Sequence, residues 1–358
     1  MKRNLLLISL VTGMVIGCNS GSSSNNNVAP VASVQYSTLH GYNDESGSTL
    51  VTGIRGVNGS SYVYISGVYS GTTNSGLLYV GPISTTGGTW HLLNYPSSAG
   101  VTVTSTSLYG PNNGDTSGTV QIVGNYTTAE SAGSAIGLLY QGAVDGSGAW
   151  STLLPPSPDN SSVINTIAHS TMGGLVVGNY DTRLATGKAF IYDITNNSYI
   201  NLVKPGAVSI TAYGIWYNGG TSYTIAGGYS DANARGITTG YLVDWDSATN
   251  TTSHWTSFNY LNEPANSIVS HFEGITTDGN GGYNLAADVA LASGVAGAAF
   301  VNVPRRNADG TFGTASWTNI AYPGANVISA NTVYQNNILG VYVPQGSTSV
   351  YPYLATLP

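Results

Sequence analysis

Three ionisable side chains lie close together in a chain that is otherwise poor in charge. Asp, Glu, Lys and Arg make up only 7% of the residues, against about 25% in ordinary globular chains. His271 and Glu273 are two positions apart in an extended segment, which places both on one face of a strand. Asp288 closes the next apolar run. We predict that the three side chains come within reach of one another or of a common small ligand.

Three interpretations of this cluster remain open from the sequence. His271 can form a structural pair with Glu273 or Asp288, because a buried charge is costly unless it is paired. The three residues can instead contact a ligand, or they can simply be exposed. An enzyme acting on saccharides would use Glu273 or Asp288 as general acid or base. That chemistry requires two carboxyls about 5–10 Å apart with pKa values pushed apart.

Other patterns that carry chemistry are incomplete. Gly-x-Ser-x-Gly and His-Glu-x-x-His are absent, so neither a nucleophile elbow nor a zinc-protease helix is predicted. The segment 278–282 alternates acid and amide as a calcium loop does, but no glutamate closes it, and a hairpin turn explains it. The five histidines match no metal-site spacing: His40, His91, His169, His254 and His271. We predict no catalytic residue, no metal site and no cofactor.

The element that must position the cluster is a repeated four-stranded unit of about 50–60 residues. Each unit ends in an aromatic residue followed, three positions later, by an apolar one. The six copies of this marker begin at Tyr36, Trp90, Trp150, Tyr199, Trp255 and Trp317. A second marker, Gly-x-Tyr, closes an apolar run in five units. Gly, Asn, Asp and Ser clusters separate the runs, and no segment shows a sustained helical period.

Four short strands in each repeated unit predict the blade of a β-propeller. The unit that begins at Asn326 has only three strands, and the missing outer strand is supplied by residues 34–39 at the other end of the chain. The predicted fold is therefore all-β, a six-bladed propeller of four-stranded antiparallel blades, with the last blade closed by the N-terminal strand.

The cluster departs from this repeat in the fifth unit. Asp288 stands where the second marker has tyrosine, and Glu273 and His271 stand in columns that carry no charge in the other units. In the alignment made from the sequence, the column of Glu273 holds Thr52, Thr106, Thr166, Tyr213 and Asn331. The column of His271 holds Leu50, Thr104, Ile164, Thr211 and Ser329. Because the loops at one face of a propeller gather there, any pocket is predicted to open on the face where the inner strands begin.

The N-terminal segment has the layout of a secretory signal peptide, with Lys2 and Arg3 before an apolar run too short to span a bilayer. This run ends Val15-Ile16-Gly17-Cys18, which resembles the bacterial lipobox. The resemblance implies lipid on Cys18, cleavage before it, and a membrane anchor of two or more acyl chains. We predict a signal peptide over 1–17, an acylated cysteine and flexible tether over 18–32, and the propeller over 33–358.

The location and partners follow from the same segment and from the charge. No Asp follows Cys18, which favours the outer membrane or cell surface. Without Lys2 and Arg3 the chain has 7 basic and 16 acidic side chains, a net charge of −9, which argues against nucleic acid as a partner.

Part of the repeat resembles the extracellular HAF-repeat family. The resemblance rests on Ala212–Ile215, Thr224–Tyr229 and Gly240–Leu242, and on Lys188–Tyr192 with lysine in place of the family's histidine. It implies an exported repeat protein and supplies no catalytic residues. We therefore expect a non-enzymatic binding or scaffold module for a glycan or an envelope protein. The alternative is a carbohydrate-active hydrolase or lyase with its site in the fifth blade.

Overall fold

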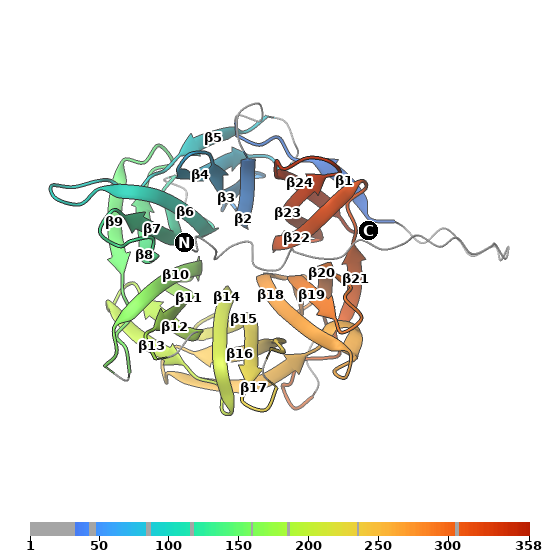
Figure 1. Cartoon of the computed structure of the whole chain (residues 1–358). Helices are drawn as coiled ribbons and strands as arrows, with labels where there is room; N and C mark the ends of the chain where they lie inside the picture. The colour runs from blue at the N-terminus through green and yellow to red at the C-terminus, as the bar shows by residue number, and fades with distance from the viewer. Residues whose placement is uncertain are drawn as a thin grey trace.

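The computed structural model describes residues 33–42, 48–83, 87–114, 118–158, 160–184, 187–234, 236–304 and 308–358. In these ranges, 24 strands form six four-stranded antiparallel sheets, which stand as blades around a central axis (Figure 1). The predicted all-β, six-bladed propeller is confirmed. Cys18 and the rest of the segment 1–32 lie outside the described residues.

Each blade contributes one strand to each of four concentric layers. The inner strands, which surround the axis, are β2 (Ser48–Gly56), β6 (Val103–Pro111), β10 (Val163–Met172), β14 (Ala207–Gly219), β18 (Ser267–Thr277) and β22 (Ala325–Tyr334). The second strands are β3 (Val63–Ser70), β7 (Val120–Thr128), β11 (Leu175–Thr182), β15 (Ser222–Asp231), β19 (Tyr283–Leu291) and β23 (Asn337–Pro344). The third strands are β4 (Asn74–Gly81), β8 (Ile136–Gly142), β12 (Lys188–Asp193), β16 (Thr239–Asp246), β20 (Ala296–Val303) and β24 (Tyr351–Thr356). The outer strands are β5 (Thr89–Leu92), β9 (Gly148–Leu153), β13 (Ser198–Leu202), β17 (Thr251–Phe258), β21 (Ser316–Ile320) and β1 (Gln35–Thr38).

Local sequence explains why these segments form hairpins. The runs are rich in Val, Ile, Tyr and Thr, which suit a pleated, half-buried surface. Between β10 and β11 the turn consists of Gly173 and Gly174, which both have positive φ (60° and 84°). A two-residue hairpin turn of this hand requires that conformation, which glycine adopts without steric cost. Apart from one short 3₁₀ turn, Tyr260–Asn262, the described residues contain no helix. None of them therefore belongs to a helix long and apolar enough to cross a membrane.

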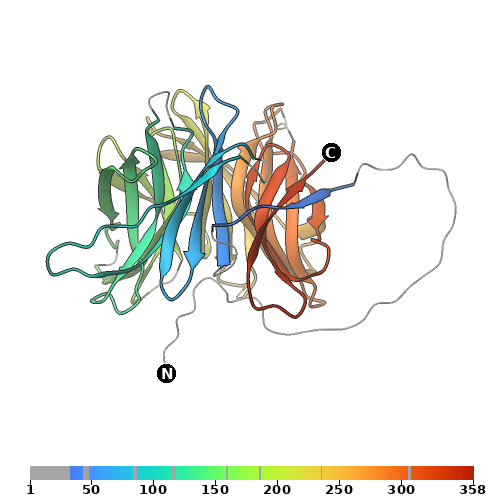
Figure 2. The ribbon, with the colours of Figure 1, turned by 90° about the horizontal axis from the view of Figure 1, so that it is seen from above.

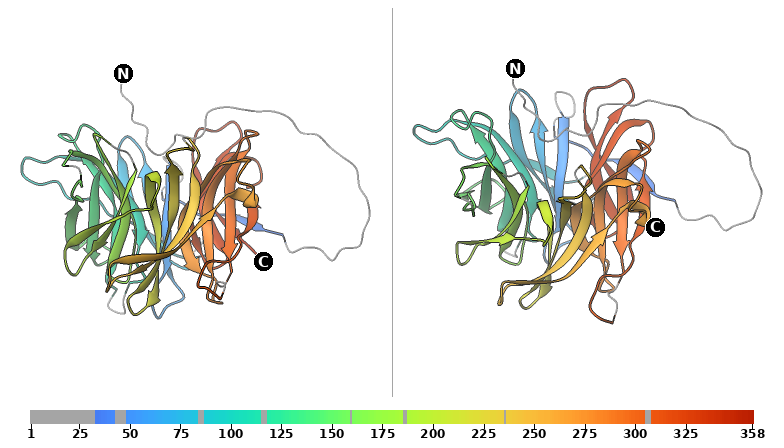
Figure 3. Two further views of the ribbon diagram at one scale, coloured as in Figure 1. Left: turned by 90° about the horizontal axis from the view of Figure 1, so that it is seen from below. Right: turned by 60° about the horizontal axis from the view of Figure 1, so that its bottom comes forward.

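The ring is closed by β1, as predicted. β1 pairs antiparallel with β24, with Gln35 opposite Thr356 and Thr38 opposite Tyr353. Figures 2 and 3 show the ring from the side, with β1 lying against the last strands of the chain. The last blade therefore has the strand order β1-β24-β23-β22.

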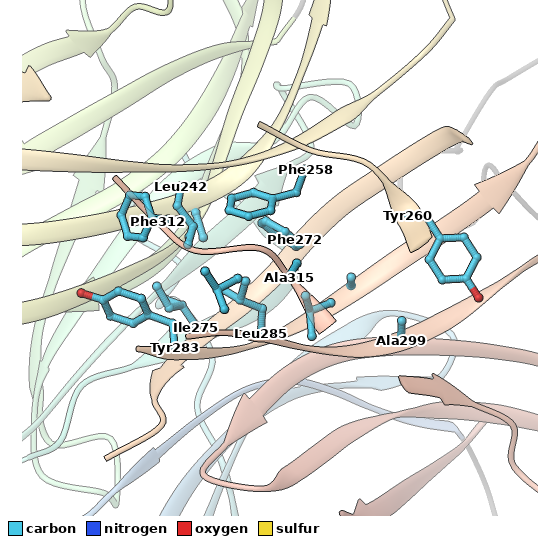
Figure 4. Close-up of a cluster of buried hydrophobic side chains, with 14 of the residues drawn as sticks. Leu242, Phe258, Tyr260, Phe272, Ile275, Tyr283, Leu285, Ala299, Phe312 and Ala315 are labelled. Atoms are coloured by element: carbon cyan, nitrogen blue, oxygen red, sulfur yellow. The ribbon is translucent and has the colours of Figure 1, made fainter. Parts of the chain in front are cut away.

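The hydrophobic core is divided among the six contacts between neighbouring blades. Each buried cluster combines residues of two successive blades. Between the fourth and fifth blades, Leu242 and Phe258 pack with Phe272, Ile275 and Leu285 (Figure 4). The aromatic residues of the outer strands line these clusters, as expected for residues that hold one blade against the next. Because the core lies between blades, the axis is left to polar side chains.

Candidate functional site

The axis is lined by β-bulges, one in each inner strand. In all six blades, one residue of the inner strand is skipped in the pairing with the second strand, and it lies at the same level in each blade. A bulge leaves the extra residue unpaired and re-aims its side chain. The six bulged residues are Thr52, Tyr109, His169, Tyr213, Glu273 and Asn331. Glu273 is thus the bulged residue of the fifth blade, at the same level of the axis as the bulged residues of the other five blades.

Five of the six bulged residues line one small cavity on the axis. All six inner strands contribute to its wall, including Arg55 of β2, Ser170 of β10 and Thr332 of β22. Its free space is about 20 Å³, which is room for about one water molecule. Most of the wall comes from the second halves of the inner strands. The cavity therefore lies further along the axis than the face where these strands begin, where the sequence placed the pocket.

His271 and Glu273 are in contact, as the sequence predicted. His271 Nδ1 lies 2.6 Å from Glu273 Oε1, and the two side chains are 15% and 18% exposed. His271 Nε2 lies 2.7 Å from the hydroxyl of Thr211 in the fourth blade. Burial lowers the pKa of His271, but Glu273 outweighs it, so the net effect is a raised pKa. Both imidazole nitrogens have partners, and the pair joins two blades.

Asp288 completes the group from the neighbouring strand. It lies directly opposite His271 in the pairing of β18 with β19, on the same face of the sheet. One of its carboxylate oxygens accepts a hydrogen bond of 3.2 Å from the backbone N–H of Ala330 in the sixth blade. Burial, followed by the charge of Glu273, raises the pKa of Asp288 to about 8. This carboxyl therefore holds its proton to a much higher pH than an ordinary aspartate does.

The register corrects the position given to Asp288 in the repeat. Phe272, just before the bulge, pairs with Ala287, and the corresponding partner in the other five blades is the glycine of Gly-x-Tyr. Asp288 thus occupies the middle position of the marker, and Val289 takes the place of the tyrosine. The same column holds Asn125 in the second blade and Asn179 in the third. This column is therefore polar in three blades. The pattern is not visible when Asp288 is aligned one position later, with the tyrosine of the marker.

The bulges also correct the columns of two other blades. Thr106 and Thr166, aligned with Glu273 from the sequence, lie three residues before the bulged Tyr109 and His169. The sequence feature that could have given the correct alignment is the small residue directly after each bulge, which is glycine in four blades. A Cβ at Gly53 would overlap the carbonyl oxygen of Tyr109, and one at Gly110 would overlap that of His169. Successive inner strands are that close at this level.

Aromatic and imidazole rings connect the bulges of the second, third and fourth blades with His271 of the fifth blade. The His169 and Tyr213 rings stack with centroids 3.6 Å apart. Tyr109 meets His169 edge to face at 5.2 Å, and Tyr213 meets His271 at 4.5 Å. Burial lowers the pKa of His169 to about 3, so its imidazole is neutral, with Nε2 2.7 Å from Asn179 Oδ1. The sequence singled out neither His169 nor Tyr109 for this site.

The third residue that sequence reasoning missed is Arg55. Its guanidinium extends from the first blade and donates to the carbonyl oxygens of Ile215 at 2.9 Å and Ile275 at 3.3 Å, and to the hydroxyl of Ser170 at 3.3 Å. It is only 5% exposed. Burial lowers the pKa of Arg55 to about 10, so it remains charged at neutral pH. Nothing in the local sequence of β2 indicates partners 115 to 220 residues away.

The arrangement can recognise a small polar group more readily than it can surround a substrate. It offers a carboxylate held by a histidine, a carboxyl with a raised pKa and two stacked rings. Ordinary small-molecule pockets enclose about 300–1,000 Å³, far more than the space on this axis. Among the described residues, no group of three or more His, Cys, Asp and Glu side chains could hold a metal ion.

Comparison with known proteins identifies no family for this chain. No protein-family model matches it, and no curated protein matches it in sequence. Solved structures with a similar chain path include the α-L-arabinanase of Penicillium chrysogenum in complex with arabinobiose, at 11% identity and a TM-score of 0.49. That match covers 91% of this chain and 99% of the arabinanase.

Two further matches have other activities. The parainfluenza virus 5 hemagglutinin-neuraminidase ectodomain has 9% identity and a TM-score of 0.47, covering 90% of this chain and 84% of that one. The periplasmic gluconolactonase of Pseudomonas aeruginosa has 8% identity and a TM-score of 0.46, covering 85% of each chain. Likenesses this distant assign neither a function nor a site. The resemblance to HAF repeats stays a prediction.

Proposed function

We propose that this propeller is a non-enzymatic binding module of the cell envelope, and that its axial cluster binds a terminal polar group of a glycan. The observation that carries the proposal is the contact of His271 with Glu273 beside Asp288, where Glu273 lines a cavity with room for about one water. Carboxyl and imidazole groups match the hydroxyl groups of a sugar. The small cavity suits one group at the end of a ligand.

Tyrosines in the loops that precede the inner strands could also contact a ligand, but two of them are engaged elsewhere. Tyr95 stacks on Tyr126 with centroids 3.8 Å apart, and its hydroxyl contacts Thr152. Tyr260 is only 5% exposed and packs in a core cluster. The axial cluster therefore carries the binding proposal in place of these loops.

An enzyme acting on saccharides has one observation in its favour. The raised pKa of Asp288 beside Glu273 is the pattern expected of a general acid paired with a second carboxylate. Such an enzyme must place a glycosidic bond between the two carboxyls, and the axial cavity lacks the volume for a sugar ring. We therefore favour binding over cleavage.

Glu273→Gln is the direct test of the binding proposal. We expect the purified chain to bind a subset of glycans on an array, and Glu273→Gln to lose at least about tenfold in affinity, the size of one hydrogen bond to a charged group. The melting temperature is expected to hold or rise, since functional sites often carry buried charge at the expense of stability. Glu130→Gln, the same change at an exposed position, is the control.

Four outcomes contradict the proposal. Failure of the wild-type chain to bind any glycan would reject glycan recognition, and capture of an envelope protein instead would move the ligand to another class. Equal glycan affinity of Glu273→Gln and Glu130→Gln would show that the axial cluster is not part of the binding site. Shortened glycans, detected by mass spectrometry, would show an enzyme.

The anchor at Cys18 is a separate part of the proposal. Cys18→Ser is expected to abolish incorporation of labelled palmitate and to leave the precursor unprocessed or the propeller unattached, because the lipid is joined through that thiol. Label in the membrane fraction is the measurement, with Ser20→Ala as the control. Palmitate that still enters the Cys18→Ser chain would exclude the lipobox.

A further inference from the structure

Arg55 brings a buried positive charge to the axis without a carboxylate partner. Its guanidinium donates to three backbone carbonyls and one serine hydroxyl, and its centre lies 5.7 Å from the ring of Trp216. These are neutral or weakly polar partners. A buried cation is costly unless its charge is balanced, so the arrangement calls for an anion.

The acidic groups near the axis are already engaged. Glu273 contacts His271, and Asp288, whose pKa is raised by burial, accepts the N–H of Ala330. His169, which also lines the wall, is neutral. The positive charge of Arg55 is therefore in contact with no carboxylate.

Two buried donors of residues in the cavity wall, the Nε–H of Arg55 and the O–H of Tyr109, find no acceptor among the described residues. The Asn125 amide lies near the Tyr109 oxygen and lowers the pKa of that hydroxyl, as a donor to it would, so it does not take up the hydroxyl proton. Arg55 and Tyr109 are nearly inaccessible, at 5% and 6% exposure. The Ser170 hydroxyl, which accepts from Arg55, keeps its own proton to donate. Buried donors almost always find a partner, and all three belong to the wall of one cavity.

We propose that the axial cavity is a binding site for a single monovalent anion of halide size, held by the Nε–H of Arg55 and the hydroxyl of Tyr109. The free space of about 20 Å³ fits one atom or one water molecule and excludes phosphate or a sugar acid. A halide accepts hydrogen bonds from all sides and supplies the missing negative charge. The donors of this site are separate from the His271–Glu273 pair, but Glu273 lines the same cavity, so a bound halide and a glycan group that enters the cavity would exclude each other.

The test follows melting of the full-length chain in detergent at pH 7, as sodium bromide replaces sodium gluconate at constant ionic strength. Binding to the folded state alone raises stability with ligand concentration, so we expect a saturable rise of several degrees. Tyr109→Phe keeps the ring and removes one donor, and it is expected to weaken the apparent bromide affinity about tenfold. Arg55→Lys is expected to abolish the bromide response.

Tyr140→Phe is the matched control, because it removes another tyrosine hydroxyl of the second blade, which donates to the carbonyl of Ala143 away from the axis. It is expected to lower stability while the bromide dependence stays as in the wild type. Crystals grown in bromide are expected to show one anomalous peak on the axis beside Arg55.

Melting that is independent of bromide, or an unchanged bromide dependence in Tyr109→Phe, would overturn the proposal and leave a water molecule in the cavity. Formate acting as well as bromide would assign the site to carboxylates, and the halide assignment would be wrong. If Arg55→Lys fails to fold, Tyr109→Phe and the anomalous peak decide.

Discussion

Deletion of residues 33–40 is expected to destabilise the whole propeller by about 5 kcal/mol or more. The deletion removes β1, which pairs with β24 over four residues, and it removes Leu39, which is 3% exposed in the cluster between the last and first blades. One buried leucine contributes about 1.5–3 kcal/mol, and each strand hydrogen bond about 1 kcal/mol. The deletion also breaks the contacts of Tyr36 and Thr38 with Tyr322.

The effect extends beyond the last blade because the core lies between blades. Loss of β1 leaves β24 as an exposed edge and opens the contact with the first blade, so the first and last blades both lose a partner. The measurement is chemical unfolding followed by circular dichroism. Deletion of residues 19–30, predicted as tether, is the control and is expected to leave the midpoint unchanged. Equal effects of the two deletions would contradict ring closure by β1.

Asp288→Asn is expected to stabilise the protein at alkaline pH and to leave it unchanged near pH 4. Because the pKa of Asp288 is raised to about 8 in the folded chain, from about 3.9 when unfolded, the folded state binds more protons between these values. Stability therefore falls as pH rises from about 4 to about 8. Asparagine keeps an acceptor for the N–H of Ala330 and carries no charge. We expect Asp288→Asn to raise the free energy of unfolding by about 2–4 kcal/mol above pH 8, after allowing for partial solvent exposure.

His271 contributes to stability with the same sign. Its pKa is raised in the folded state, so its stabilising effect is complete below its unfolded pKa of about 6.5 and is lost as pH rises through the folded value. The wild-type chain is thus expected to lose stability from pH 5 to pH 9, and Asp288→Asn to flatten that slope. The midpoints of urea unfolding at pH 5, 7 and 9 measure this pH dependence for both chains.

Asp145→Asn serves as the control for this pH dependence. Asp145 is exposed, and hydrogen bonds from Ser147 lower its pKa, so its replacement is not expected to flatten the slope. An Asp288→Asn chain as sensitive to alkaline pH as the wild type would show that Asp288 is ionised in the folded state.

The fold, the number of blades and the closing strand can all be predicted from the amino-acid sequence. These follow from the spacing of markers such as Trp90 and Trp150, and from the short last unit whose fourth strand begins near Tyr36. Such features are local and repeated, and the burial of one blade against the next requires the same pattern in every unit. The contact of His271 with Glu273 was predictable for the same reason, because it depends only on alternation along one strand.

Which residues meet on the axis could not be predicted without the three-dimensional arrangement of the six inner strands. A bulge inserts one unpaired residue and changes the register without changing the hydrophobic pattern, which is why Thr106 and Thr166 were aligned where Tyr109 and His169 belong. The same shift moved Asp288 by one position. Arg55 meets its partners through ring closure, across separations of 115 to 220 residues. Periodicity in a sequence reports burial within a strand, whereas convergence on an axis depends on how six separate strands are placed in space.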